Sequence, residues 1–166
     1  NLANLIRAYD RFKKHEQSNV KLLVVGERKW WTGDMEQAYQ SCGSKDEIIF
    51  AGRKNDDELG PITASALGMV YVSHFEGFGI PVLESMCCDV PVICSSTTSL
   101  PEVGGDAVLY AEPSNVDSIA SAMIRLYKEP GLSQGLVAKA RIQREKFSWE
   151  KTAGLLWESI EKCLKA

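Results

Sequence analysis

The chain has 166 residues, of which 45% are hydrophobic and 25% charged, and this is the composition of an ordinary globular domain with its own core. No apolar run approaches the roughly 18 residues that a membrane-spanning helix requires, so we expect a soluble segment. The 19 basic and 22 acidic residues leave no basic excess. Composition therefore excludes a disordered, collagen-like or disulfide-stapled chain, and it makes nucleic acid a poor candidate partner.

The cysteine pattern favours a reducing compartment, and we expect a cytoplasmic protein. The number of cysteines is odd and no C-x-x-C pair occurs. Cys94 ends an apolar run, where a thiol behaves as a small hydrophobic group. Because His15 and His74 lack any ligand spacing to these thiols, a zinc site is not expected. The cysteines are Cys42, Cys87, Cys88, Cys94 and Cys163.

The chain begins with a helical pattern and then alternates short apolar runs with further helical patterns. Apolar residues at three- and four-residue steps predict a helix over 2–14. Continuous apolar runs, typical of strands buried on both faces, occur at 21–25, 48–51, 69–72, 91–94 and 107–110. Helices are predicted after the caps Thr32 and Asp56, from Ile80-Pro81, over 116–127 and 131–146, and after the cap Ser148.

This alternation predicts one α/β domain over 1–166, a Rossmann-like doubly wound parallel sheet with helices on both faces. The first helix has no strand before it, although a βαβ unit needs one. We therefore expect the leading strand to lie outside this chain.

The loop after the third strand is the main candidate site, because ligands of open parallel sheets bind beyond the carboxyl ends of the strands. It runs from Ser73 into a helix that begins near Ile80. The first amides of that helix have no intrahelical acceptor and suit a phosphate. We predict Phe78, Gly79 and Ile80 as the donors.

Two glutamates flank these amides. Glu76 lies in the loop and Glu84 in what the pattern predicts to be the first turn of the helix. Carboxylates that faced a diphosphate would repel it, so we expect each to accept hydrogen bonds from ribose or sugar hydroxyls. The alternative is that Glu84 only complements the helix dipole and Glu76 is a solvated loop residue.

The full string is more specific than the spacing of the two glutamates. The segments 76–95, 99–107 and 147–150 together resemble the E-x7-E signature and flanking blocks of the retaining glycosyltransferases of family 4. The resemblance implies the GT-B arrangement, in which two Rossmann-like domains face each other across a cleft. This chain is similar to the C-terminal, donor-binding half. The implied reaction transfers a hexose from a nucleoside diphosphate sugar to an acceptor hydroxyl, in polysaccharide or glycolipid synthesis.

The same resemblance implies roles for individual residues. Glu84 holds the ribose hydroxyls, Glu76 contacts the donor sugar as the catalytic residue, and the backbone of 78–80 meets the diphosphate. Gly26 approaches the donor. Arg53 and Lys54 lie along the base, or else they are solvated loop charges. No metal is implied, and the donor is of the GDP-mannose or UDP-glucose type, with base, sugar and acceptor left open.

Two departures from the family pattern carry expectations. Asp89 stands where glycine is usual, and aspartate tolerates the left-handed conformation expected there. Relatives carry an Arg and a Lys just before the first helix, and this chain starts at Asn1, after that position. We therefore expect a fragment that binds nucleotide weakly and is inactive without its N-terminal acceptor domain, which would also make any membrane contact.

Three questions remain open at this stage. The chain is also compatible with half of a GT-B epimerase or phosphorylase, or with a non-catalytic nucleotide-binding module. Trp30 and Trp31 stack on a ligand or cover the end of the sheet. Trp149 and Trp157 suit packing in the core or between domains.

Overall fold

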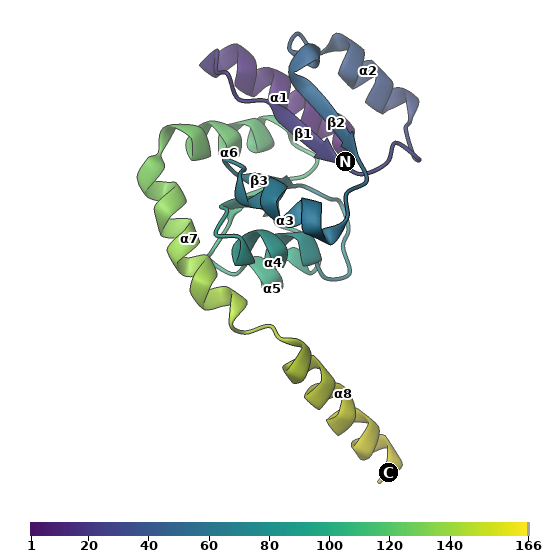
Figure 1. Cartoon of the computed structure of the whole chain (residues 1–166). Helices are drawn as coiled ribbons and strands as arrows, with labels where there is room; N and C mark the ends of the chain where they lie inside the picture. The colour runs from purple at the N-terminus through teal and green to yellow at the C-terminus, as the bar shows by residue number, and fades with distance from the viewer. Residues whose placement is uncertain (166) are drawn as a thin grey trace.

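A computed structural model describes residues 1–165 as five short parallel strands, covered by helices, in two separate sheets (Figure 1). The first sheet contains β1 (Leu22–Val25) and β2 (Ile48–Gly52). The second has the order β3-β4-β5 and contains β3 (Met69–Tyr71), β4 (Val92–Ser95) and β5 (Leu109–Ala111). The predicted parallel α/β fold is confirmed, but the described residues form two sheets instead of one.

Helices cover both faces of the β3-β4-β5 sheet. The helices are α1 (Leu2–Glu16), α2 (Gly33–Ser41), α3 (Asp56–Ala64), α4 (Ile80–Cys87), α5 (Leu100–Gly104), α6 (Val116–Lys128), α7 (Pro130–Arg144) and α8 (Trp149–Leu164), and a 3-10 turn spans Lys45–Glu47. One core joins α1, α2 and α6 to the strands, and the other joins α4 and α5 to them. In β4, Ile93 faces the first core while Val92 and Cys94 face the second, so this strand is buried on both faces.

The strand β1 is not buried on both faces, contrary to prediction. Leu23 is 42% exposed and Val25 is 37% exposed. Ile49 of β2 is likewise 43% exposed. The alternate residues Leu22 and Val24 pack on the core that contains α1 and α2. These helices therefore cover only one face of the β1–β2 sheet.

Most predicted helix starts are correct, and two are shifted by one residue, since α7 begins at Pro130 instead of residue 131 and the cap of α3 also differs. Thr32 and Ser148 cap their helices as predicted, each accepting a hydrogen bond from a backbone amide. The cap of α3 is Asn55 instead of Asp56: the Asn55 side chain accepts from the Glu58 amide (2.9 Å), and the Glu58 carboxylate accepts from the Asn55 amide (3.2 Å). This reciprocal pair satisfies two amides that otherwise have no partner and fixes the start of the helix.

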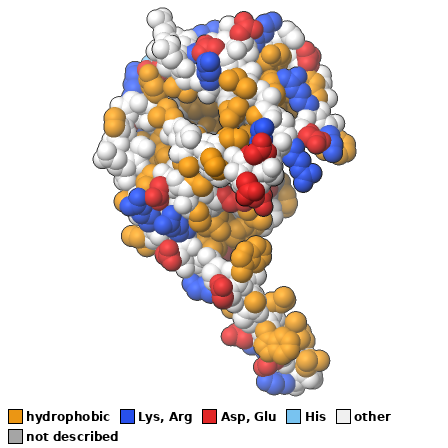
Figure 2. All heavy atoms as spheres, viewed as in Figure 1, with side chains coloured by type: hydrophobic (Ala, Val, Ile, Leu, Met, Phe, Trp, Pro, Cys, Tyr) orange, Lys and Arg blue, Asp and Glu red, His pale blue; other side chains and the backbone are white. Residues whose placement is uncertain are grey.

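The last helix, α8, leaves the body of the domain (Figure 1). Its apolar stripe is exposed, with Trp149 at 82% and Trp157 at 61% (Figure 2). These tryptophans therefore do not pack in the core of residues 1–165, and the prediction that they could is wrong. No helix among the described residues is long and apolar enough to cross a membrane.

Asp89 adopts the predicted left-handed conformation, with φ 56°. Its carboxylate accepts hydrogen bonds from Arg141 (2.7 Å) and Arg144 (3.2 Å) of α7. The hydrogen bond from Arg141 is the main reason that the pKa of Asp89 lies below its usual value. The turn after α4 is thereby tied to α7.

Candidate functional site

The loop between β3 and α4 lies at the carboxyl end of its sheet, and its shape depends on Gly79. This glycine has φ 107° and is buried. A Cβ atom there would lie 2.5 Å from Cδ2 of Leu100, a fully buried side chain of α5. Only glycine combines this backbone conformation with so close an approach, so the loop passes directly over α5.

The backbone of this loop is held from one side by the turn after β4. The Ser99 hydroxyl lies 2.9 Å from the carbonyl oxygens of both Glu76 and Phe78. In a planar trans peptide the N–H points opposite to the C=O, so the amides of Gly77 and Gly79 point away from Ser99. Within residues 1–165 no hydrogen bond is donated by the amides of 77–80. The loop thus presents a run of free donors, as the sequence predicted for 78–80.

Two threonines next to Ser99 complete this support. The Glu76 amide donates to Thr98 Oγ1 (3.2 Å), and Thr97 Oγ1 donates to the His74 carbonyl (3.4 Å). Thr98 has φ 55°, which is uncommon for a residue other than glycine. Sequence reasoning did not assign these three hydroxyls. Their position directly after β4 could have indicated this role, because the loops that follow neighbouring parallel strands lie side by side.

Glu76 is half-buried and oriented by a tyrosine. Tyr71, the last residue of β3, donates from its hydroxyl to Glu76 Oε1 at 2.7 Å. Burial, reinforced by this hydrogen bond, raises the pKa of Tyr71 to about 12, so the phenol remains a donor at neutral pH. One carboxylate oxygen of Glu76 is therefore engaged within the protein. This partner was not predicted from the sequence.

Glu84 is exposed, and its side chain makes no hydrogen bond or ion pair within the described residues. It is the fifth residue of α4, so its predicted place in the first turn is wrong. The interaction of a carboxylate with the helix dipole falls off beyond the first turn. This position therefore weakens the interpretation of Glu84 as a dipole partner and leaves its carboxylate free for a ligand.

The other predicted residues lie on the β1–β2 sheet. The Gly26 amide donates to the Gly52 carbonyl (2.9 Å), which joins the loops that follow the two strands. Arg53 is exposed, whereas Lys54 pairs with Glu58 (3.4 Å). No described hydrogen bond or ion pair links this group to residues 76–84. The structure thus brings the predicted residues together in two groups, one on each sheet.

The two adjacent tryptophans differ in environment. Trp31 packs edge-on against Phe50 (5.6 Å between ring centroids) and Tyr39, and the Arg28 guanidinium lies 3.5 Å from the Phe50 centroid. Trp30 is 87% exposed. Trp31 therefore covers the end of the sheet, and Trp30 remains available for stacking.

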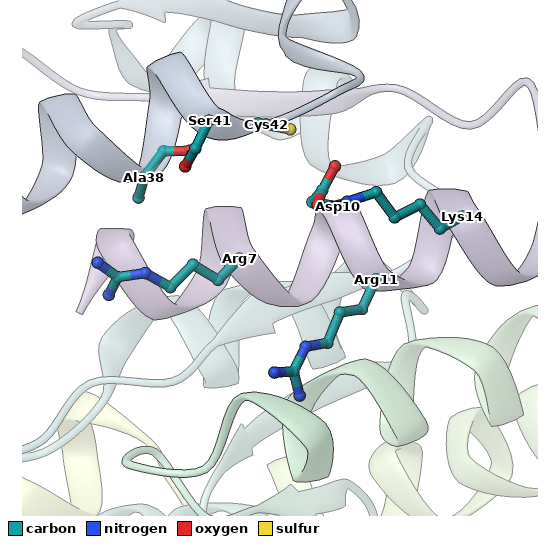
Figure 3. A pocket seen from close by; sticks show the side chains of 7 residues that line it. All are labelled: Arg7, Asp10, Arg11, Lys14, Ala38, Ser41 and Cys42. Carbon is teal, nitrogen blue, oxygen red and sulfur yellow. Dashed lines mark hydrogen bonds and ion pairs between the residues drawn. The ribbon is translucent and has the colours of Figure 1, made fainter.

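A hollow of about 210 Å³ lies between α1 and α2 and away from this loop (Figure 3). Three cations of α1 line it, but each has a carboxylate partner. Arg7 pairs with Asp34, Arg11 with Asp117, and Lys14 with Asp10 (2.6 Å). Since its positive charge is already neutralised, this hollow does not compete with the β3–α4 loop as an anion site.

Comparison with known proteins agrees with the fold. The family described as "Glycosyl transferases group 1" matches residues 1–143. The O-antigen chain mannosyltransferase B of Escherichia coli is 35% identical over 150 residues, which make up 90% of this chain but only 39% of that protein.

Two solved structures share the fold at lower identity. Sucrose-phosphate synthase of Thermosynechococcus elongatus has a TM-score of 0.78 and 24% identity, covering 98% of this chain and 42% of that one. Anabaena HepE, solved with UDP and glucose, has a TM-score of 0.80 and 18% identity, covering 95% and 44%. The chain spans about two fifths of the length of these proteins.

Proposed function

We propose that this chain, which belongs to the group 1 glycosyltransferases, is the donor-binding half of a retaining hexosyltransferase. The proposed reaction moves a hexose from a nucleoside diphosphate sugar to an acceptor hydroxyl in polysaccharide or glycolipid synthesis. The role of this half is to hold the donor and to stabilise the negative charge that develops on the leaving diphosphate.

The observation that carries the proposal is the run of unbonded amides at 77–80 between two carboxylates. These amides stand at the positive end of α4 and suit the diphosphate. Glu84, exposed and without an ion pair among residues 1–165, suits the vicinal hydroxyls of a ribose. Glu76, fixed by Tyr71, is proposed to contact the sugar.

The second group is proposed to complete the donor site. Gly26 has open space where a side chain would lie, so a ligand can approach its backbone. Arg53 is exposed and has no ion pair among the described residues, so it is a better candidate than Lys54 to lie along the nucleotide base. Lys54 is held by Glu58, so its part in binding requires that this pair open. No metal is included in the proposal.

The preferred donor is GDP-mannose, with UDP-glucose as the alternative, because the Escherichia coli relative is named as a mannosyltransferase. The proposed partner is an N-terminal acceptor domain of the same polypeptide, which would supply any contact with a membrane. The exposed apolar face of α8 suits packing against such a domain. We place the enzyme in the cytoplasm on account of its five unpaired cysteines.

The test is Glu84→Ala in the full-length enzyme, titrated calorimetrically with GDP, UDP and ADP. Loss of charge-assisted hydrogen bonds worth about 1.5–3 kcal/mol predicts a roughly 10- to 100-fold weaker affinity for the matching nucleotide. The melting temperature should change little, because the exposed Glu84 side chain makes no hydrogen bond or ion pair within residues 1–165.

Glu102→Ala is the matched control, since Glu102 is also an exposed helical glutamate and is not part of the proposed site. Unchanged affinity in Glu84→Ala, together with a lower melting temperature, would contradict the donor site and favour a structural role. Product analysis with intact enzyme and the two donor sugars separates transfer from mere nucleotide binding.

A further inference from the structure

The segment that follows β4 holds the loop that follows β3 through hydroxyl groups. Four of the five residues from 95 to 99 use a side-chain hydroxyl to bind the backbone of residues 73–78. Three of the four donate to carbonyl oxygens. Thr98 does the opposite, since its Oγ1 accepts a hydrogen bond from the backbone amide of Glu76 at 3.2 Å. Thr98 is thus the one member of this group of hydroxyls that binds an amide, and the amide belongs to the glutamate proposed to contact the sugar.

Thr98 makes this contact from a strained backbone. Its φ is 55°, in the left-handed region. A β-branched residue is an outlier there, because its Cβ crowds the carbonyl oxygen that follows. The other residues besides glycine with positive φ in the described part of the chain, Gln17 and Asp89, are not β-branched. Glycine would relieve the strain at this position, but it would supply no hydroxyl.

The backbone on both sides of Thr98 is fixed, so the strain cannot relax locally. On one side the Ser96 amide donates to the carbonyl of Ala111, the last residue of β5 (3.3 Å). On the other side the Ser99 hydroxyl binds two carbonyls of the β3–α4 loop, and Leu100 is fully buried. Strained residues persist where their surroundings determine the conformation in this way, and they cluster at functional sites.

Glu76 is held at three points, and Thr98 provides one of them. Its amide donates to Thr98, its carbonyl accepts from Ser99 (2.9 Å), and its Oε1 accepts from the Tyr71 hydroxyl (2.7 Å). Its Oε2 makes no hydrogen bond or ion pair within residues 1–165. Since the backbone and one carboxylate oxygen are both anchored, the direction of the second oxygen is restricted as well. Functional groups held in this way are oriented before the ligand arrives.

We propose that Thr98 is a positioning residue for Glu76, and that the strained threonine is retained for its hydroxyl. Thr98 fixes the backbone that carries the carboxylate, Tyr71 fixes Oε1, and Oε2 is the oxygen presented to the donor sugar. Orientation of a group that acts in the transition state raises kcat more than it tightens binding of the substrate. The role at the sugar rests on the proposed function, whereas the hydrogen bond to Thr98 does not.

Three substitutions in the full-length enzyme separate the hydroxyl of Thr98 from its backbone. Thr98→Ser keeps an oxygen at the same position. Thr98→Val keeps the β-branched shape, and with it the strain, but removes the acceptor. Thr98→Gly removes the acceptor and also relieves the strain.

Activity and stability should rank these variants differently. We expect kcat for hexose transfer to fall about 3- to 10-fold in Thr98→Val and Thr98→Gly and to stay near the wild-type value in Thr98→Ser. KM for the donor should change less than about 2-fold. Thr98→Gly should melt at a higher temperature than Thr98→Val, because the strain is gone, yet it should transfer hexose no faster.

Hydrogen exchange of the Glu76 amide, measured by NMR without nucleotide, tests the contact apart from the reaction. We expect this amide to exchange about 10-fold faster in Thr98→Val and Thr98→Gly than in wild type and Thr98→Ser. The Gly77 amide is the internal control, since it donates no hydrogen bond within residues 1–165. Its exchange rate should be the same in all four proteins.

Three results would overturn the proposal. Equal exchange of the Glu76 amide in all four proteins would mean that Thr98 does not hold it. A wild-type kcat in Thr98→Gly, or a kcat that follows the melting temperature across the variants, would leave Thr98 with a structural role alone. Failure of the proposed function has a different signature, because the wild-type enzyme itself would then neither bind nucleotide nor transfer hexose. That result would remove the role at the sugar while the difference in exchange persisted.

Discussion

Gly79 provides the most direct test of how the loop is built. In Gly79→Ala the new Cβ would lie 2.5 Å from Cδ2 of Leu100, and the backbone would keep φ 107°. The strained backbone costs about 1–3 kcal/mol. Overpacking a buried site costs a further ~1–3 kcal/mol, because the fully buried Leu100 side chain must shift to admit the new Cβ. The expected loss of unfolding free energy is therefore roughly 2–6 kcal/mol, a large part of a typical domain's stability.

Gly77→Ala is the matched control, only two residues away in the same loop. An added Cβ at Gly77 meets no atom within 4 Å, and its φ lies outside the left-handed range. We expect a change of about 0.5 kcal/mol or less in either direction. Urea denaturation of both variants in the same full-length background gives the comparison through the midpoint. Equal midpoints would refute the explanation based on Gly79.

The two contributions at Gly79 are separable. Adding Leu100→Ala to Gly79→Ala removes the atom that the new Cβ would meet but leaves the backbone conformation unchanged. We expect the two substitutions together to cost less than their sum by about 1–3 kcal/mol. Strict additivity would mean that strain of the backbone alone accounts for the loss.

Two further predictions concern the surroundings of the loop. Ser99→Ala removes the hydroxyl that donates to the Glu76 and Phe78 carbonyls. We expect the free energy of unfolding to fall by about 0.5–1.5 kcal/mol, and KM for the donor to rise more than kcat falls. Ser99→Thr keeps a hydroxyl at this position and should retain most of the affinity for the donor. Because the folded-state pKa of Asp89 is lowered, its pairing with Arg141 stabilises the protein above the unfolded pKa of about 3.9 and is lost as pH falls through the lower folded value. Melting curves of wild type and Asp89→Asn should therefore converge below about pH 4, and a constant difference down to pH 2 would contradict this.

Local features of the sequence predicted most helices and strands and the loop 73–84. The β3–α4 boundary was readable because glycine, a proline near the first helical position and an apolar run act over a few residues. Asp89 was predicted in its left-handed conformation for the same reason, since that preference belongs to the residue and its turn. The apolar face of α8 was also readable as a stripe, but not the fact that residues 1–165 leave it exposed.

What only the tertiary structure decided is which distant residues meet. Ser99 supports Glu76 and Phe78 because β3 and β4 are neighbours, and no local pattern in either segment encodes that adjacency. Tyr71 reaches Glu76 because the loop turns back over the end of its own strand. The division of the sheet between β1 and β3 likewise follows from strand order, which depends on contacts between residues far apart in the chain. Periodicity and capping thus determined the elements, and long-range packing determined the geometry of the site.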